Sequence, residues 1–171
     1  MLPKIETILY VTDIQHDASY VFRYALALAR QHQAKIFALH AMEPLPPFGQ
    51  SLVDQYISRD TSEEKRNEAR ENVKAQLKKR MEEICTKECN NSPSCENIVS
   101  SIQVIQGYPA EVIVDTANAI SANLIVMGER SQNLVSKVML GSTTRKVLNR
   151  ADQPILVVKI PKGYEEELNL F

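Results

Sequence analysis

Two glycines and a run of hydroxyl residues carry the most suggestive chemistry in this chain. Gly128 follows an apolar run, and residues 141–144 read Gly-Ser-Thr-Thr at the start of a predicted helix. Glycine has no Cβ and lets another group approach the backbone closely. The first amides of a helix lack acceptors within the helix, so they attract anions such as phosphate, and the hydroxyls add donors. The residues predict a phosphate cradle, although Gly128 as a strand end and Ser142 as an N-cap explain them equally well.

A second chemical feature is Asp13, which follows the first apolar run of the chain. Its carboxylate can accept a hydrogen bond from a ribose hydroxyl or from an adenine edge. The alternative is that Asp13 only opens the turn before the next helix. No lysine follows Gly141 and Ser142 in the manner of a P-loop, and no G-x-G-x-x-G follows the first strand, which disfavours a dinucleotide fold.

The elements that must position these residues alternate along the chain. Apolar runs predict strands over 5–11, 35–42, 101–106, 123–127 and 154–160, and helical periodicity predicts helices over 17–32, 62–86, 110–120 and 143–150. This alternation predicts one α/β domain over 1–171, with a core at about 5–160 and a C-terminal extension at 161–171. We expect a doubly wound, five-stranded parallel sheet with helices on both faces. Ligands of such sheets bind beyond the carboxyl ends of the strands, where Asp13, residues 41–43 and Gly128 would meet.

Composition narrows the class of protein. The 171 residues carry a net charge of −1, so the basic surface of a nucleic-acid-binding protein is absent. No run approaches the ~18 apolar residues that a membrane span needs. No export signal is evident, and we expect a cytoplasmic location. The odd number of cysteines (Cys85, Cys89 and Cys95) argues against a disulfide framework, and their spacing fits no standard zinc site; a redox-sensitive or metal-binding loop is the alternative.

Five short motifs, in the right order, resemble the universal stress protein family. They are Val11-Thr12-Asp13, Leu39-His40-Ala41, the segment 107–113, Met127-Gly128 followed by Leu140-Gly141-Ser142, and the closing strand 154–159. The fourth is similar to the family's G-x2-G-x9-G-[ST] signature. Each motif is weak alone, but together they are specific.

The resemblance implies the strand order 3-2-1-4-5 and a dimer. In the family's nucleotide-binding branch it implies a site for ATP (or ADP or AMP), often with Mg²⁺, in which Asp13 and the backbone of Ala41 hold adenosine. The residues that this assigns to nucleotide binding are Val11, Thr12, Asp13, Ala41, Met127, Gly128, Ser131, Gly141, Ser142 and Thr143. Ser131 departs from the signature, which has glycine there. Serine would carry a penalty of roughly 1 kcal/mol if the position needs a positive φ, or its Cβ would crowd a phosphate. Its hydroxyl could instead act as a donor and partly compensate.

Three functions compete at this point. The resemblance favours an ATP-binding stress-response regulatory protein, acting as a nucleotide-dependent dimeric switch or with slow ATP hydrolysis. A nucleotide-free dimeric interaction module with a vestigial pocket is the alternative that Ser131 motivates. A genuine ATPase or nucleotidyl transferase has little support, because no catalytic base is evident beside a nucleophile and no carboxylate pair suits two metals. His40 is expected to be a buried, satisfied histidine, with a general-base role beside Glu43 as the other possibility.

Partners follow from the last strand. An apolar strand at the edge of a sheet invites pairing with another strand. We therefore expect a two-fold homodimer through Pro154, Ile155, Leu156, Val157 and Val158. A signalling or stress-response protein is the other expected partner, of unknown identity, whereas no nucleic acid and no membrane span are expected.

Overall fold

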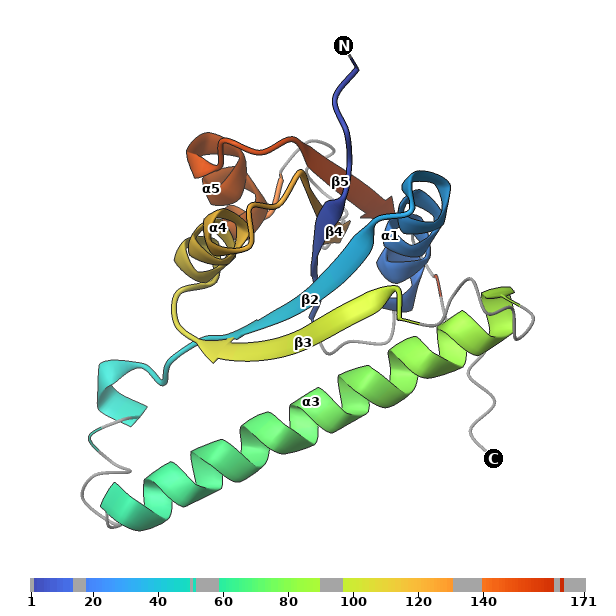
Figure 1. Cartoon of the computed structure of the whole chain (residues 1–171). Helices are drawn as coiled ribbons and strands as arrows, with labels where there is room; N and C mark the ends of the chain where they lie inside the picture. The colour runs from blue at the N-terminus through green and yellow to red at the C-terminus, as the bar shows by residue number, and fades with distance from the viewer. Residues whose placement is uncertain are drawn as a thin grey trace.

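The computed structural model describes residues 2–13, 18–49, 51, 59–89, 97–130, 140–161 and 164. Strands and helices alternate along these residues (Figure 1). They are β1 (Thr7–Val11), α1 (Ala18–His32), β2 (Lys35–Met42), α3 (Arg59–Cys89), β3 (Val99–Gln106), α4 (Pro109–Ala119), β4 (Leu124–Arg130), α5 (Ser142–Arg150) and β5 (Ile155–Ile160).

One five-stranded sheet organises the chain. Its order is β3-β2-β1-β4-β5, and all four neighbouring pairs are parallel. This confirms the predicted fold class and strand order, including the edge positions of β3 and β5. The chain starts in the centre at β1, builds outward to β3, and then returns to β4 on the other side of β1. The connections therefore diverge between β1 and β4, which is where such sheets bind ligands.

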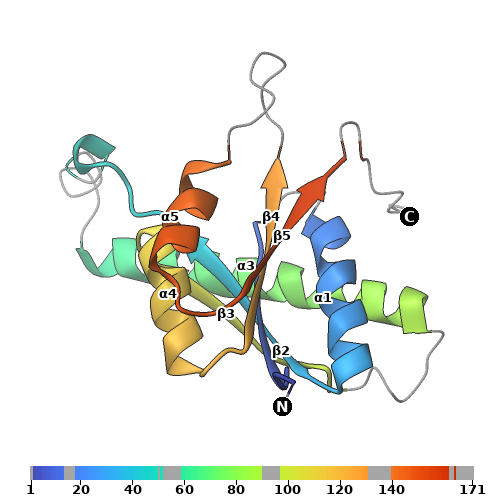
Figure 2. The same ribbon diagram turned by 90° about the horizontal axis from the view of Figure 1, so that it is seen from above.

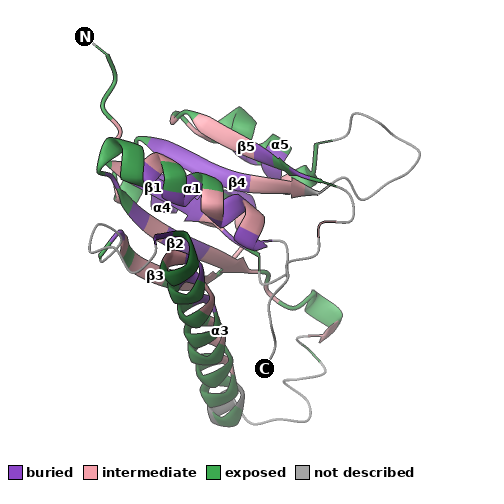
Figure 3. Ribbon diagram, turned by 90° about the vertical axis from the view of Figure 1, so that its right-hand side faces the viewer, coloured by how far each residue is buried: buried purple, intermediate pink, exposed green. Residues whose placement is uncertain are grey.

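Helices cover both faces of the sheet. α1 and α3 lie on one face, and α4 and α5 on the other (Figure 2). Side chains alternate between the two faces because successive residues of a strand point to opposite sides. In β1, Ile8 and Tyr10 join the core under α1 and α3, whereas Leu9 joins the core under α4 and α5. Both cores are fully buried at the centre of the sheet (Figure 3), which fixes the strand ends that line the site.

α3 and β4 extend furthest beyond their predicted ends. α3 covers 31 residues rather than 62–86, because its charged residues are good helix formers and continue the helix beyond its contact with the core. Its buried side chains are Leu77, Met81, Ile84 and Cys89, while Ala69 nearer the N-terminus is exposed. β4 continues past residue 127 to Arg130, because β5 pairs with it along this whole stretch.

The expectation about the cysteines needs correction. Cys89 is disulfide-bonded, whereas the odd cysteine count had argued against any disulfide framework. An odd count excludes pairing of all three thiols, but it does not exclude one bridge. Cys85, one helical turn earlier, is a free thiol. Within the described part of the chain, no helix is both long enough and apolar enough to cross a bilayer.

Candidate functional site

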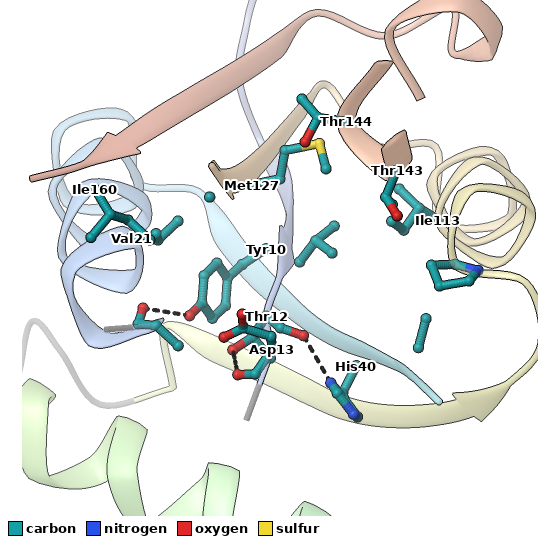
Figure 4. A pocket seen from close by; sticks show the side chains of 15 residues that line it. Tyr10, Thr12, Asp13, Val21, His40, Ile113, Met127, Thr143, Thr144 and Ile160 are labelled. Carbon is teal, nitrogen blue, oxygen red and sulfur yellow. Dashed lines mark hydrogen bonds between the residues drawn. The ribbon is translucent and has the colours of Figure 1, made fainter. Parts of the chain in front are cut away.

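A cavity of about 260 Å³ opens at the carboxyl ends of β1, β2 and β4 (Figure 4). Seven residues that the sequence assigned to the site line it, namely Val11, Thr12, Asp13, Ala41, Met127, Gly128 and Thr143. They come from three strand ends and from the first turn of α5. The sheet therefore brings together residues that lie up to 132 positions apart in the sequence, from Val11 to Thr143.

The end of β1 is held by a small network of hydrogen bonds. The backbone N–H of Thr12 donates to the carbonyl oxygen of Leu39 on β2 over 2.9 Å. The Thr12 hydroxyl donates to the carbonyl oxygen of Asp13 over 2.7 Å. Thr12 itself is buried, and Asp13 is exposed at the mouth of the cavity (Figure 4). Thr12 thus has a positioning role, and the carboxylate of Asp13 stands where a ligand would meet it.

His40 lines the cavity, where the sequence favoured a buried, satisfied histidine over a general base beside Glu43. Its Nδ1 lies 2.9 Å from the carbonyl oxygen of Thr12, and its ring is half-buried. A carbonyl oxygen only accepts, so Nδ1 carries the proton in this bond. In the neutral ring Nε2 is then an acceptor for a ligand's hydrogen-bond donor. Glu43 lines a neighbouring groove and not this cavity, so the pair is not gathered in one site for general-base chemistry.

Gly128 lies inside β4 and does not end the strand. It pairs with Val158, and β4 continues for two more residues. A Cβ at this position would lie 2.7 Å from Cγ2 of Val21 on α1 and 3.4 Å from Cδ1 of Ile160. Real Cβ atoms essentially never come this close to another heavy atom. The absence of a side chain is therefore required by the packing of α1 against β4 at the cavity wall.

The N-terminus of α5 forms the other side of the site. Gly141 is the N-cap residue, with φ −52° and ψ 151°, and no side chain caps the helix. A Cβ here would meet only Oγ1 of Thr144, at 3.8 Å. Neither a positive φ nor internal packing therefore demands a glycine. The space beside this backbone is open, as the sequence predicted for a residue that an outside group approaches.

Gly141, which the family resemblance assigns to phosphate binding, already has an acceptor for its backbone amide. The backbone N–H of Gly141 donates to Oε1 of Glu129 over 3.1 Å. Glu129 follows Gly128 on β4 and is half-buried. No role for Glu129 follows from the sequence, although a carboxylate immediately after the first signature glycine, where the family commonly has small or uncharged residues, is a signal for one. The helix terminus therefore holds a negative group, as its geometry favours, but this group belongs to the protein.

Two predicted residues lie beside the cavity rather than in its wall, and a third cannot be placed. Ser142 lines a second groove of about 260 Å³, together with Lys146 and Arg150, and Gly141 lines neither space. Thr143 lines both spaces. Ser131 lies outside the described residues. No group of three or more potential metal ligands occurs in the part of the chain that the structure describes.

Sequence reasoning also missed most of the apolar wall. Tyr10, Ala18, Val21, Pro109, Ile113 and Ile160 line the cavity from β1, α1, α4 and β5. Val21 and Ile160 approach from one face of the sheet, and Ile113 and Thr143 from the other (Figure 4). Apolar periodicity marks such residues as core, and only the crossing of elements at the sheet edge brings them to the site.

The arrangement matches a known family. The model of the universal stress protein family matches residues 4–159. The chain belongs to this family. A universal stress protein of Thermus aquaticus is 30% identical over 155 residues, which is 90% of this chain and 98% of that protein.

Solved structures of universal stress proteins have the same fold. The structure of MJ0577 from Methanocaldococcus jannaschii superposes with a TM-score of 0.63 at 25% identity, over 93% of this chain and 99% of that one. A universal stress protein in complex with cAMP superposes with a TM-score of 0.58 at 15% identity, over 93% of this chain and all of the other.

Proposed function

We propose that this universal stress protein binds an adenine nucleotide and acts as a nucleotide-dependent regulatory protein in a stress response. The observation that carries the proposal is the cavity at the point where the strand connections diverge, with Asp13, the Ala41 backbone and the first turn of α5 around it. Membership of the family and the complex of another member with cAMP support the same ligand class.

Each wall of the cavity suits one part of a nucleotide. The Asp13 carboxylate accepts hydrogen bonds from ribose hydroxyls, and the backbone of Ala41 with Nε2 of His40 faces the base. The apolar side chains of Val21 and Ile113 pack on the base and sugar. The backbone amide of Thr143 lies in the first turn of α5 and donates a hydrogen bond to a phosphate oxygen.

A divalent cation fits this donor set. Mg²⁺ is bound in proteins by one or two carboxylates together with substrate phosphates and water. Asp13 and Glu129 are the carboxylates at the mouth of the cavity and at the α5 terminus. When bound, Mg²⁺ would neutralise phosphate charge, and these two residues are the ones that would hold it.

Isothermal titration of AMP, ADP and ATP tests the proposal. We expect saturable heat at sub-millimolar ligand for at least one of them. A filled-cavity variant, Ala41→Phe, should abolish it, because the new ring occupies the base region, whereas Ala119→Phe at the C-terminal end of α4 serves as a control with the same change in composition. No heat at millimolar ligand in the wild-type protein would contradict the proposal.

One observation favours a second candidate function. The Glu129 carboxylate occupies the Gly141 amide, as expected of a vestigial pocket in a nucleotide-free interaction module. The variant Ser131→Gly, which restores the family signature, separates the two functions. Nucleotide binding that appears only in this variant identifies the native protein as a non-binder, whereas equal binding by both proteins supports the first function.

We further propose a homodimer through β5, an edge strand whose Ile155, Leu156 and Val157 are half-exposed. A cytoplasmic location stays a prediction from the sequence. It implies a reducing environment, so the Cys89 disulfide should be reduced in freshly lysed cells. Trapping of thiols at lysis, followed by mass spectrometry, measures this directly.

A further inference from the structure

The contact between Glu129 and Gly141 joins two elements across the proposed phosphate site. Glu129 lies near the end of β4, and Gly141 is the N-cap residue of α5. The carboxylate oxygen accepts the Gly141 amide proton at 3.1 Å, a normal hydrogen-bond length. A phosphate oxygen that used this amide would have to displace the carboxylate.

The pleat of β4 explains why the carboxylate faces α5. Ile125 and Met127 belong to the core under α4 and α5, and Glu129 is the next residue on that side of the strand. Its partner in the neighbouring strand is Lys159, on the same face. No ion pair joins these two side chains in the part of the chain that the structure describes. The negative charge of Glu129 is therefore directed to the helix terminus and not compensated by the adjacent strand.

Other charges near the helix terminus are arranged unevenly. Lys146 and Arg150 of α5 line the second groove, and Arg150 lies 3.5 Å from the Glu111 carboxylate. Neither side chain lines the cavity at the strand ends, whereas Asp13 does. Arg145 is exposed on α5. A ligand in the cavity thus meets the Asp13 carboxylate, and phosphates that extend from it to the N-terminus of α5 meet the Glu129 carboxylate.

The size of the cavity agrees with this electrostatic pattern. Pockets for small ligands usually measure about 300–1,000 Å³, and this one lies just below that range. Such a volume suits a nucleoside with a short phosphate group. A triphosphate would extend beyond the cavity, and its added charges would come closer to the Glu129 carboxylate.

We propose that Glu129 is a specificity-determining residue, whose carboxylate occupies the Gly141 amide and selects nucleotides with few phosphate charges, such as AMP, over metal-free ATP. This inference rests on the proposed nucleotide-binding function. Each extra phosphate adds negative charge that the carboxylate repels, and a repulsion between partly solvated unit charges at a few ångströms changes affinity by about five- to tenfold. Mg²⁺ reduces the net charge of ATP, and so reduces the difference in affinity between AMP and ATP.

The test measures the affinities of AMP, ADP and ATP by isothermal titration, with EDTA and then with Mg²⁺. The variant Glu129→Gln keeps an oxygen that can accept the Gly141 proton but removes the charge. The control Glu68→Gln removes one exposed carboxylate from α3 and changes the net charge equally. In EDTA we expect the wild-type protein to bind AMP at least as tightly as ATP. Glu129→Gln should raise ATP affinity by about tenfold and AMP affinity by about threefold or less.

The possible results distinguish a failure of the role of Glu129 from a failure of the proposed nucleotide-binding function. An unchanged ratio of ATP to AMP affinity in Glu129→Gln, or the same shift in Glu68→Gln, overturns this inference but leaves the proposed function standing. Tighter binding of ATP than of AMP by the wild-type protein in EDTA also overturns it, and needs no variant. Absence of nucleotide binding by every protein overturns the proposed function, and this inference with it.

Discussion

Packing constrains the residue types at the cavity wall as strongly as contact with a ligand does. Gly128 carries the first signature position, yet its contacts are with α1 and β5. The missing Cβ lets Val21 approach the strand, and Val21 in turn lines the cavity. A side chain at 128 would move α1 and the cavity wall together. The same glycine thus serves the fold and the shape of the site.

Gly128→Ala should lower the free energy of unfolding by about 1–3 kcal/mol, because the new methyl group would sit 2.7 Å from Cγ2 of Val21. Val21→Ala removes the atom that it meets. The double variant should therefore lose at least 1 kcal/mol less than the sum of the two single losses. Urea denaturation measures all three. Gly49→Ala is the control, since its Cβ would have no contact closer than 3.8 Å; additive losses would reject this account.

Asp13→Ala should weaken nucleotide binding by about 10- to 100-fold, because a hydrogen bond to a charged group contributes about 1.5–3 kcal/mol. Asp152→Ala removes an equally charged, exposed residue outside the cavity and should leave affinity unchanged. Titration calorimetry with the tightest-binding nucleotide measures both variants. Equal affinities of Asp13→Ala and wild type would remove Asp13 from the site.

The site could be predicted in part from sequence. Motifs after strand ends predicted Asp13 and Ala41 at one edge of the sheet, because parallel strands bring their carboxyl ends together, and the helix start at 141–144 predicted Thr143. All three line the cavity. His40 was read as core, since no sequence pattern reveals which strand residue lies at a cavity. Glu129 was missed, because its role depends on a contact with an amide twelve residues away across a loop.

Elements differ in how closely sequence patterns define them. Apolar runs predicted each strand of the sheet, and helical periodicity predicted each helix that packs on it, since each element must bury one face against the same core. Element ends were less well predicted. β4 is prolonged by its neighbour β5, and α3 by helix-forming charged residues without core contacts. Apolar periodicity predicts neither extension, because it contains no information about strand pairing or about solvent-exposed helix formers.

The C-terminal part of α3 holds a thiol in an unusual environment. Cys85 is half-buried against the core and free, and Cys89 one turn later is disulfide-bonded. Burial raises the pKa of the Cys85 thiol, and the nearby negative charge of Glu82 raises it further. Both effects disfavour the thiolate, which is the reactive form.

Alkylation of Cys85 by iodoacetamide should therefore be slower than that of a free cysteine peptide near pH 8, and should accelerate only at higher pH. Because its pKa is raised, this thiol becomes a thiolate only at a higher pH than the thiol of a free cysteine peptide. Glu82→Gln removes the second cause and should speed the reaction, whereas Glu83→Gln, on an exposed neighbouring position, should not. Mass spectrometry without reductant follows the rate at each pH. A wild-type rate matching that of the peptide throughout would refute the pKa shift.

At the scale of the whole molecule, the two edges of the sheet differ in what covers them. α3 lies beside β3 (Figure 1). Its Met81 and Ile84 are buried in the core. β5 pairs with β4 on one side, and its first three residues are half-exposed. Open edges with apolar side chains favour pairing with a second strand. This contrast is the physical basis for assigning the proposed dimer contact to β5 rather than to β3.

Val157→Lys should convert the dimer into a monomer at micromolar concentration, because a lysine amine at the edge resists burial against a second copy. Ile105→Lys is the matched control. Ile105 is a half-buried residue of the opposite edge strand, and it packs against the same core as Val157. Both variants should lose similar thermal stability, so a change in mass confined to Val157→Lys reports the interface and not misfolding. Multi-angle light scattering gives the mass, and a monomeric wild-type protein, or dimers in all three proteins, would exclude β5 as the contact.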